Sequence, residues 1–297
     1  MKVIFATQMG MCFGVRDAIL TAENIPDPNR VTIHGEIVHN PQVMQTLLAR
    51  GFHAHPEADR ANVPASQHVL VTAHGISNAE RERLFRAGKV LVDTTCPLVQ
   101  RVHQAAQSLQ REGYFVVLIG RPGHVEVDGI TGDLKDYAVV SSVDDVRRYD
   151  ADRIGIVCQS TTPPSQARAI HEAIVRINPG RQIRFADTIC RPTRERQEAA
   201  LTLLERIDAL VVVGGKHSNN TRQLGLLAES RGVPWRHVET EADIDPLWFA
   251  PFRVVGLTAG TSTPDSTIQS VHAALLKLGP PRPTTVRAED KLPPRLV

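Results

Sequence analysis

The sequence contains a three-fold repeat in which a short apolar run leads to a cysteine and then to a segment of helical periodicity. The cysteines are Cys12, Cys96 and Cys190, so the repeats are 84 and 94 residues apart. Apolar runs that alternate with amphipathic segments are typical of βα units, which build parallel sheets covered by helices on both faces. The repeat therefore predicts three small α/β units, whereas the length of 297 residues alone would suggest two domains.

We expect the units to divide the chain at its cysteines. The first unit covers 13–95 and the second 96–189, and the third combines 1–12 with 190–279. The remaining residues, 280–297, are rich in proline and lack periodicity, which predicts an irregular tail. If the units face one another about a pseudo-three-fold axis, the fold is a trefoil around a central cavity.

Each unit contains two further apolar runs, and each run ends at a polar residue. These polar residues lie at similar sequence distances from the cysteine of their unit. Ligands of open α/β sheets bind outside the carboxyl ends of the strands. We therefore expect one group of side chains to converge with the cysteines on the central cavity: His39, His74, His124, Ser160, Ser218, Asn220 and Ser262. Donors of this kind suit a multiply charged, oxygen-rich anion such as a diphosphate.

Three converging cysteines point to a bound metal group. Each lies at a strand-to-helix junction, where backbone N–H groups and the helix dipole favour a thiolate. Two groups fit: a zinc ion with an open fourth position, and a 4Fe–4S cluster with one open iron that can act as a Lewis acid. Three cysteines that pack only as small hydrophobes explain the repeat poorly. The fourth cysteine, Cys158, has no counterpart in the repeat.

One carboxylate, Glu126, follows the central run of the second unit. It lies two residues after His124, on backbone that we expect to be extended, so that both side chains face the same side. A glutamate beside a histidine at the mouth of a cavity can deliver protons, although a glutamate taken alone is more often a solvated surface residue.

Composition and charge exclude several classes of function. The 34 basic and 32 acidic residues are interspersed and leave a net charge of +2, which gives no electrostatic footprint for nucleic acid or an anionic membrane. No apolar stretch approaches the ~18 residues that span a bilayer. The N-terminal MKVIFATQMG fits a strand and turn better than a signal peptide, which predicts a cytoplasmic protein. Neither of the two glycine-rich motifs that bind nucleotides, G-x-x-x-x-G-K-[ST] and G-x-G-x-x-G, occurs in the sequence.

The motifs together closely resemble those of the LytB family, the reductases of 4-hydroxy-3-methylbut-2-enyl diphosphate in the non-mevalonate isoprenoid pathway. The resemblance extends from Met1 to about Gly279 and is carried by MCFGVRDAI, GEIVHNPQV, VTAHGIS, VDTTCPLV, LIGRPGHVEVDGITG, DTICRPTRERQEA, VVVGGKHSNNTRQL and LTAGTSTPDSTI. It implies a trefoil of three α/β domains around the cluster.

The resemblance also implies residue roles. The three repeat cysteines become the ligands of one [4Fe-4S] cluster with an open iron. Glu126, His124 and Ser160 become the catalytic residues. The diphosphate pocket comprises His39, His74, His124, Ser160, Ser218, Asn219, Asn220 and Ser262. Two positions depart from the family: Ser160 stands where a threonine is usual, and Asn219 where a serine is frequent.

The implied reaction is a reductive dehydroxylation. The substrate takes up two electrons and two protons and loses water, and the products are isopentenyl and dimethylallyl diphosphate. An external ferredoxin or flavodoxin would supply the electrons. The alternative is a lyase similar to quinolinate synthase, which also takes one cysteine from each of three α/β domains; GEIVHN, GHVE and S-x-N favour the reductase. A non-catalytic zinc or iron–sulfur sensor is a third possibility.

Overall fold

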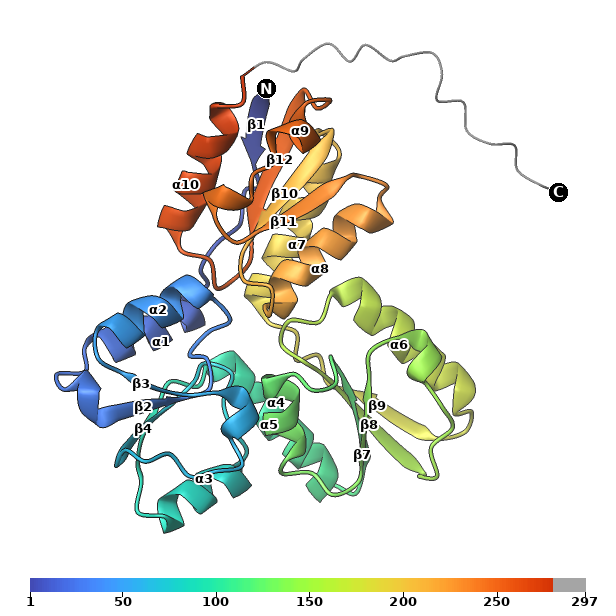
Figure 1. Cartoon of the computed structure of the whole chain (residues 1–297). Helices are drawn as coiled ribbons and strands as arrows, with labels where there is room; N and C mark the ends of the chain where they lie inside the picture. The colour runs from blue at the N-terminus through green and yellow to red at the C-terminus, as the bar shows by residue number, and fades with distance from the viewer. Residues whose placement is uncertain (280–297) are drawn as a thin grey trace, which may run out of the picture.

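The computed structural model of the chain describes residues 1–279, and the irregular tail predicted at 280–297 lies outside them. Three four-stranded sheets lie around a common centre, each with helices against its faces (Figure 1). All strand pairings in these sheets are parallel. The predicted α/β class, with three parallel-sheet units in a trefoil, is confirmed.

The first sheet has the order β3-β2-β4-β5. Its strands are β2 (Val31–His34), β3 (His53–His55), β4 (His68–Val71) and β5 (Val90–Asp93). The surrounding helices are α1 (Phe13–Glu23), α2 (Pro41–Ala49) and α3 (Asn78–Arg86), with short 3-10 turns at Pro28–Arg30 and Glu57–Asp59. Ile33 and Leu70 pack in a core with α1 and α2, whereas Val69 and Leu84 pack on the opposite face.

The second sheet has the order β7-β6-β8-β9. Its strands are β6 (Phe115–Ile119), β7 (Tyr137–Val140), β8 (Arg153–Cys158) and β9 (Gln182–Phe185). The helices are α4 (Pro97–Arg111), α5 (Val125–Thr131) and α6 (Pro164–Ile177), and Val143–Asp145 forms a 3-10 turn. The apolar stripe of α4 packs against one face, and α6 packs against the other. Cys158 is fully buried in the α6 core, which agrees with its lack of a repeat counterpart.

The third sheet has the order β1-β12-β10-β11 and joins the two ends of the described chain. Its strands are β1 (Lys2–Phe5), β10 (Ala209–Val213), β11 (Trp235–Val238) and β12 (Val254–Ala259). The helices are α7 (Arg191–Leu204), α8 (Asn219–Ser230), α9 (Pro246–Phe249) and α10 (Asp265–Leu276), with a 3-10 turn at Glu241–Asp243.

The chain passes from one unit to the next at each repeat cysteine. The strand before the cysteine is an edge strand of one sheet: β1, β5 and β9. The helix after it packs in the core of the next unit: α1 in the first, α4 in the second and α7 in the third. This crossing places all three cysteines at the centre, between units. The exact unit boundaries of 13–95, 96–189 and 1–12 with 190–279 stay a prediction.

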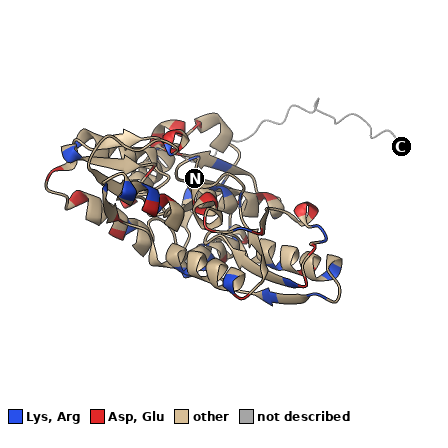
Figure 2. Cartoon of the chain, turned by 90° about the horizontal axis from the view of Figure 1, so that it is seen from below, with Lys and Arg blue, Asp and Glu red and all other residues tan. Residues whose placement is uncertain are grey.

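Acidic and basic residues are interspersed over the described chain and do not gather in one region (Figure 2). Among residues 1–279, none of the helices combines the length and the apolar character that a bilayer crossing requires.

Candidate functional site

The three repeat cysteines occupy equivalent backbone positions. Each is the N-cap residue of the helix that follows it, without a side-chain capping bond. Each backbone N–H also donates to a carbonyl in the loop after the neighbouring strand: Cys12 to Thr261 (3.1 Å), Cys96 to Ala73 (3.0 Å) and Cys190 to Ser160 (2.9 Å). The same contact is therefore made three times, and the pseudo-symmetry extends to the backbone of the site.

The thiols are half-buried at the centre. Burial raises the pKa of Cys190 to about 11 and also raises the pKa of Cys96; the charges of Cys12 and Glu126 act in the same direction on both. The helix N-termini were expected to favour thiolates, but at Cys96 and Cys190 burial outweighs the effect of the backbone N–H groups. A bound metal ion would reverse this, because it deprotonates a coordinating thiol.

The surroundings of the cysteines fit an anionic metal group. A Cβ atom at Gly14 would overlap Cys96 Sγ, so the backbone of α1 approaches this thiol more closely than any other residue type allows. Thr193 Oγ1 lies 3.1 Å from Cys190 Sγ. Arg196 is buried, and its guanidinium donates to the carbonyl of Gly10 at 2.6 Å, beside the segment that carries Cys12. A buried cation at this place favours negatively charged sulfur.

In the described part of the chain, no three His, Cys, Asp or Glu side chains form a group that could hold one metal ion.

Three histidines from two units meet beside the cysteines. The rings of His39 and His74 stack with centroids 4.1 Å apart, and His124 meets them edge-on at 5.0 and 5.8 Å. They come from the loops after β2 and β4 and from the N-cap of α5. Burial lowers the pKa of His124 to about 3 and holds the pKa of His74 well below its usual value, with the charge of His39 a second cause.

Glu126 lies in the first turn of α5, and only 2% of it is exposed. Its carboxylate accepts the Ser160 backbone N–H (2.7 Å) and hydroxyl (3.0 Å). Burial raises the pKa of Glu126, although the bonds from Ser160 oppose this effect. The Ser160 hydroxyl therefore contacts the Glu126 carboxylate directly.

The extended backbone expected at 124–126 is wrong. Helix α5 begins at Val125, and His124 caps it by accepting the Glu126 N–H at 3.1 Å. The two side chains are therefore not placed by strand alternation. Ser160, rather than His124, is the residue that the structure places against the Glu126 carboxylate.

Unit three contributes buried polar residues from the N-terminus of α8 and the loop after β12. Ser218 caps α8, Asn219 donates to Thr161 at 2.9 Å, and Asn220 accepts the Thr261 N–H at 3.1 Å. Ser262 donates to the His39 carbonyl at 3.0 Å, so this unit directly touches the histidine loop of the first. The polar residues that the sequence singled out are buried here, except His74, which is half-buried.

Several polar atoms at this centre are buried without a hydrogen-bond partner among the described residues. They are His39 Nε2, His74 Nδ1, Asn219 Oδ1 and Asn220 Nδ2. Buried polar groups are otherwise nearly always paired, so a concentration of unpaired ones indicates a polar ligand.

Sequence reasoning missed Arg196, Thr193 and Glu36. Arg196 and Thr193 lie six and three residues after Cys190, and Glu36 precedes His39 by three. Only the spacing along a helix could have suggested the first two. Nothing in the sequence pairs Glu36 with His39, because that contact forms in an irregular loop.

Comparison with known proteins agrees with this architecture. The family model of the LytB protein matches residues 3–276. A 4-hydroxy-3-methylbut-2-enyl diphosphate reductase from Aquifex aeolicus is 33% identical over 93% of this chain and 96% of its own length.

Two solved structures superpose on the chain. The structure of the E-1-hydroxy-2-methyl-but-2-enyl-4-diphosphate reductase from Plasmodium falciparum has a TM-score of 0.84 and 28% identity, and covers 94% of this chain and 89% of its own. A structure of (E)-4-hydroxy-3-methyl-but-2-enyl diphosphate reductase, described as the terminal enzyme of the non-mevalonate pathway, has a TM-score of 0.63 and 33% identity, with 93% and 99% covered. The chain belongs to the LytB protein family.

Proposed function

We propose that the chain reduces 4-hydroxy-3-methylbut-2-enyl diphosphate to isopentenyl and dimethylallyl diphosphate, as the terminal enzyme of the non-mevalonate isoprenoid pathway. Family membership supports the reaction, since the relatives over nearly the whole length are named as this reductase. The observation that carries the proposal at the level of residues is the convergence of cysteines, histidines and Glu126 on one buried centre.

Cys12, Cys96 and Cys190 would hold one 4Fe–4S cluster. When bound, the cluster supplies electrons and an open iron that acts as a Lewis acid on the substrate hydroxyl. The equivalent N-cap positions, the buried Arg196 and the close approach of Gly14 to Cys96 support this assignment.

The diphosphate would bind among the polar residues of the three units. The buried, unpaired ring nitrogens of His39 and His74 and the unpaired amide nitrogen of Asn220 support this placement, and Ser218, Asn219 and Ser262 lie in the same loops. A diphosphate carries many acceptor oxygens, which these donors can satisfy without bulk water. Binding would also exclude water, because the residues involved are already buried.

Glu126 would deliver a proton to the departing hydroxyl. Its raised pKa favours the neutral carboxylic acid, the form that can donate. Ser160 holds the carboxyl group in place through one hydrogen bond to each of its two oxygens. His124 caps the helix that bears Glu126 and orients its backbone. The substrate gains two electrons and two protons, and the hydroxyl leaves as water.

We further propose that an external ferredoxin or flavodoxin supplies the electrons, that the enzyme acts in the cytoplasm, and that the units divide at the repeat cysteines. The need for an electron donor follows from the reaction, and the cytoplasmic location follows from the N-terminal sequence.

Anaerobic turnover tests the function directly. The protein, purified without oxygen and supplied with a reduced viologen, is expected to convert the substrate to the two five-carbon diphosphates, detected by mass spectrometry. Release of the hydroxyl without consumption of reductant would indicate a lyase instead and would overturn the proposal.

A further inference from the structure

Glu36 lies in the irregular loop after β2 and holds His39 by a short hydrogen bond. Its Oε2 atom is 2.8 Å from His39 Nδ1. The hydrogen bond from His39 lowers the pKa of Glu36, so the carboxylate is ionised at neutral pH. An ionised carboxylate accepts hydrogen bonds and donates none, and the proton between the two atoms therefore belongs to His39 Nδ1.

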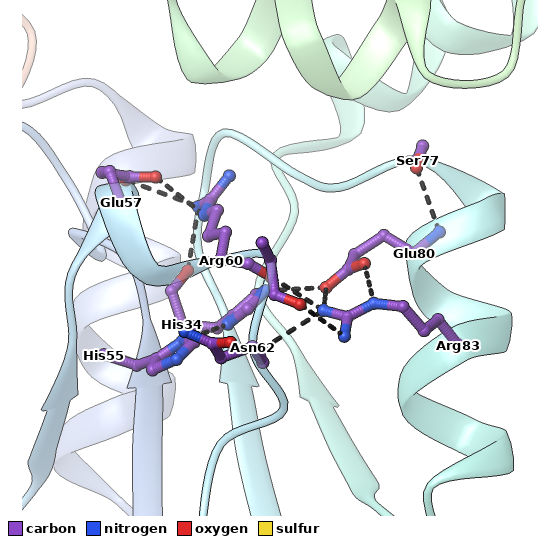
Figure 3. Close-up of polar contacts among 9 residues, drawn as sticks. His34, His55, Glu57, Arg60, Asn62, Ser77, Glu80 and Arg83 are labelled. Carbon is purple, nitrogen blue, oxygen red and sulfur yellow. Dashed lines mark hydrogen bonds and ion pairs between the residues drawn. The ribbon is translucent and has the colours of Figure 1, made fainter.

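The backbone on both sides of Gly35 is fixed by one ion pair. Glu57 Oε1 accepts the Glu36 N–H at 3.0 Å. Arg60 Nη2 donates to the His34 carbonyl at 2.8 Å (Figure 3). Glu57 and Arg60 are themselves paired at 2.7 Å. Gly35 has a φ of +103°, and a Cβ there would lie 2.7 Å from Glu57 Cδ. The loop therefore presents the Glu36 carboxylate to His39 from a clamped backbone.

The other ring nitrogen of His39, Nε2, has no carboxylate partner in the described part of the chain like the one that Nδ1 has in Glu36. His39 is 8% exposed, and its Nε2 is buried without a partner among the described residues. When Nδ1 carries the only proton, Nε2 has a lone pair that repels an anionic oxygen. Nε2 can donate to such an oxygen only after a second proton has made the ring a cation.

We propose that Glu36 is a positioning residue: it keeps a proton on Nδ1 of His39, and His39 therefore binds a diphosphate oxygen as a cation. The carboxylate of Glu36 stabilises this cation. The inference rests on the proposed function, since it concerns the same anion site. Binding of the diphosphate is consequently coupled to the uptake of a proton by His39.

Other ionisable groups act on His39, on Glu36 or on the groups beside them, which are Glu57, His74 and His124. Carboxylates come from the Glu57–Asp59 turn and from α5, and basic groups come from the end of that turn and from the loops after β6 and β10: Glu57, Glu126, Arg60, Arg121 and His217. His74 and His124 contact the ring directly. None of these carboxylates makes a hydrogen bond to His39 in the described structure, so Glu36 alone selects the protonated nitrogen.

Nitrogen NMR of the anaerobically purified full-length protein, labelled with ¹⁵N-histidine, tests the tautomer. The resonances of His39 are assigned from their loss in His39→Asn. We expect a protonated Nδ1 in the native protein and a shift toward protonated Nε2 in Glu36→Ala and Glu36→Gln. Glu82→Ala, which removes an exposed carboxylate of α3 in the same unit, should leave the signal unchanged.

Calorimetry with inorganic diphosphate tests the coupling. Titrations at pH 8 in two buffers of different ionisation enthalpy measure the protons taken up on binding. We expect Glu36→Ala to take up about one proton fewer than the native protein and Glu82→Ala, because a neutral His39 can then donate from Nε2. Glu36→Gln keeps the volume of the side chain, so an effect seen in both variants cannot come from a collapse of the loop in Glu36→Ala.

Equal proton uptake in the native protein and both Glu36 variants, or a native His39 protonated on Nε2, would overturn the inference and leave the proposed function intact. Failure of the native protein to bind diphosphate would overturn both, because the anion site itself would be wrong. Substrate turnover measured on the same preparation distinguishes the two cases: turnover is retained if only the inference fails and is absent if the proposed function fails too.

Discussion

At the scale of single residues, burial determines the properties of the site more than local sequence does. Glu126 and the thiols of Cys96 and Cys190 have raised pKa values because they are buried, and buried His74 and His124 have lowered ones. Each shift favours the neutral form of the group. Arg196 and Glu36 differ, because the guanidinium and the carboxylate that His39 contacts both stay charged.

The acid role of Glu126 predicts a large loss of turnover in Glu126→Gln, on the order of 10²-fold or more, because an amide cannot donate the proton that the leaving hydroxyl needs. Iron content and the visible spectrum should be unchanged. Ser160→Thr keeps the hydroxyl contact and should retain activity. Near-native turnover by Glu126→Gln in an anaerobic assay would remove the glutamate from the reaction.

The buried charge of Arg196 predicts opposite effects in the two forms of the protein. Arg196→Met should leave the iron-free chain as stable as the native one or more so, because a buried cation is costly without an anion. The same variant should lose iron faster, because the thiolates lose their counter-charge. The matched control is Arg191→Met, whose side chain is 84% exposed on the same helix. Equal rates of iron loss from Arg196→Met and Arg191→Met would contradict the role of Arg196 as the counter-charge of the thiolates.

At the scale of elements, the repeat predicted which helices carry the cysteines, because a βα unit must place its first helical residue after a strand end. Helices α1, α4 and α7 begin immediately after Cys12, Cys96 and Cys190. The prediction failed at 124–126, where a short helix replaces an extended segment. A helix of seven residues is too short to show periodicity in a sequence.

The contact between α1 and α4 predicts that Gly14→Ala disturbs the site. The added Cβ would overlap Cys96 Sγ, so either the thiol or α1 must move. We expect iron retention and turnover to fall although alanine favours a helix. Thr21→Ala, an exposed change in the same helix, should have little effect. Full iron occupancy in Gly14→Ala would show that the two elements are less tightly packed than the structure indicates.

The end of β2 predicts a loss of stability in acid. Burial lowers the pKa of His34 to about 4, with the charge of Arg60 as a second cause and that of Glu80 opposing. Between pH 6.5 and 4 the unfolded chain binds a proton that the folded chain does not. The free energy of unfolding should therefore decrease as the pH falls through this range, by up to about 3 kcal/mol from this residue.

Urea unfolding followed by circular dichroism between pH 4 and 7 measures this effect. His34→Gln should have a shallower dependence on pH than the native protein. The exposed His53→Gln in β3 is the control and should keep the native slope. A slope unaffected by His34→Gln would show that other groups, such as His124, cause the acid sensitivity.

At the scale of the whole molecule, the sequence predicted the three units and their common centre from the spacing of cysteines and polar strand ends. It could not show that Glu36 reaches His39 or that Arg196 reaches the Gly10 carbonyl, because the first contact depends on an irregular loop and the second joins segments 186 residues apart. Local patterns determine where elements begin, whereas the packing of units determines which side chains meet.

The central claim is that one cysteine from each crossing between units holds a single iron–sulfur cluster. Iron and sulfide content of anaerobically purified protein tests it most directly, with the buried Cys158 as an internal control. We predict about four iron atoms per chain in the native protein and in Cys158→Ala, and a large loss in Cys12→Ser, Cys96→Ser and Cys190→Ser. Native iron content in the three serine variants, or loss only in Cys158→Ala, would contradict the account.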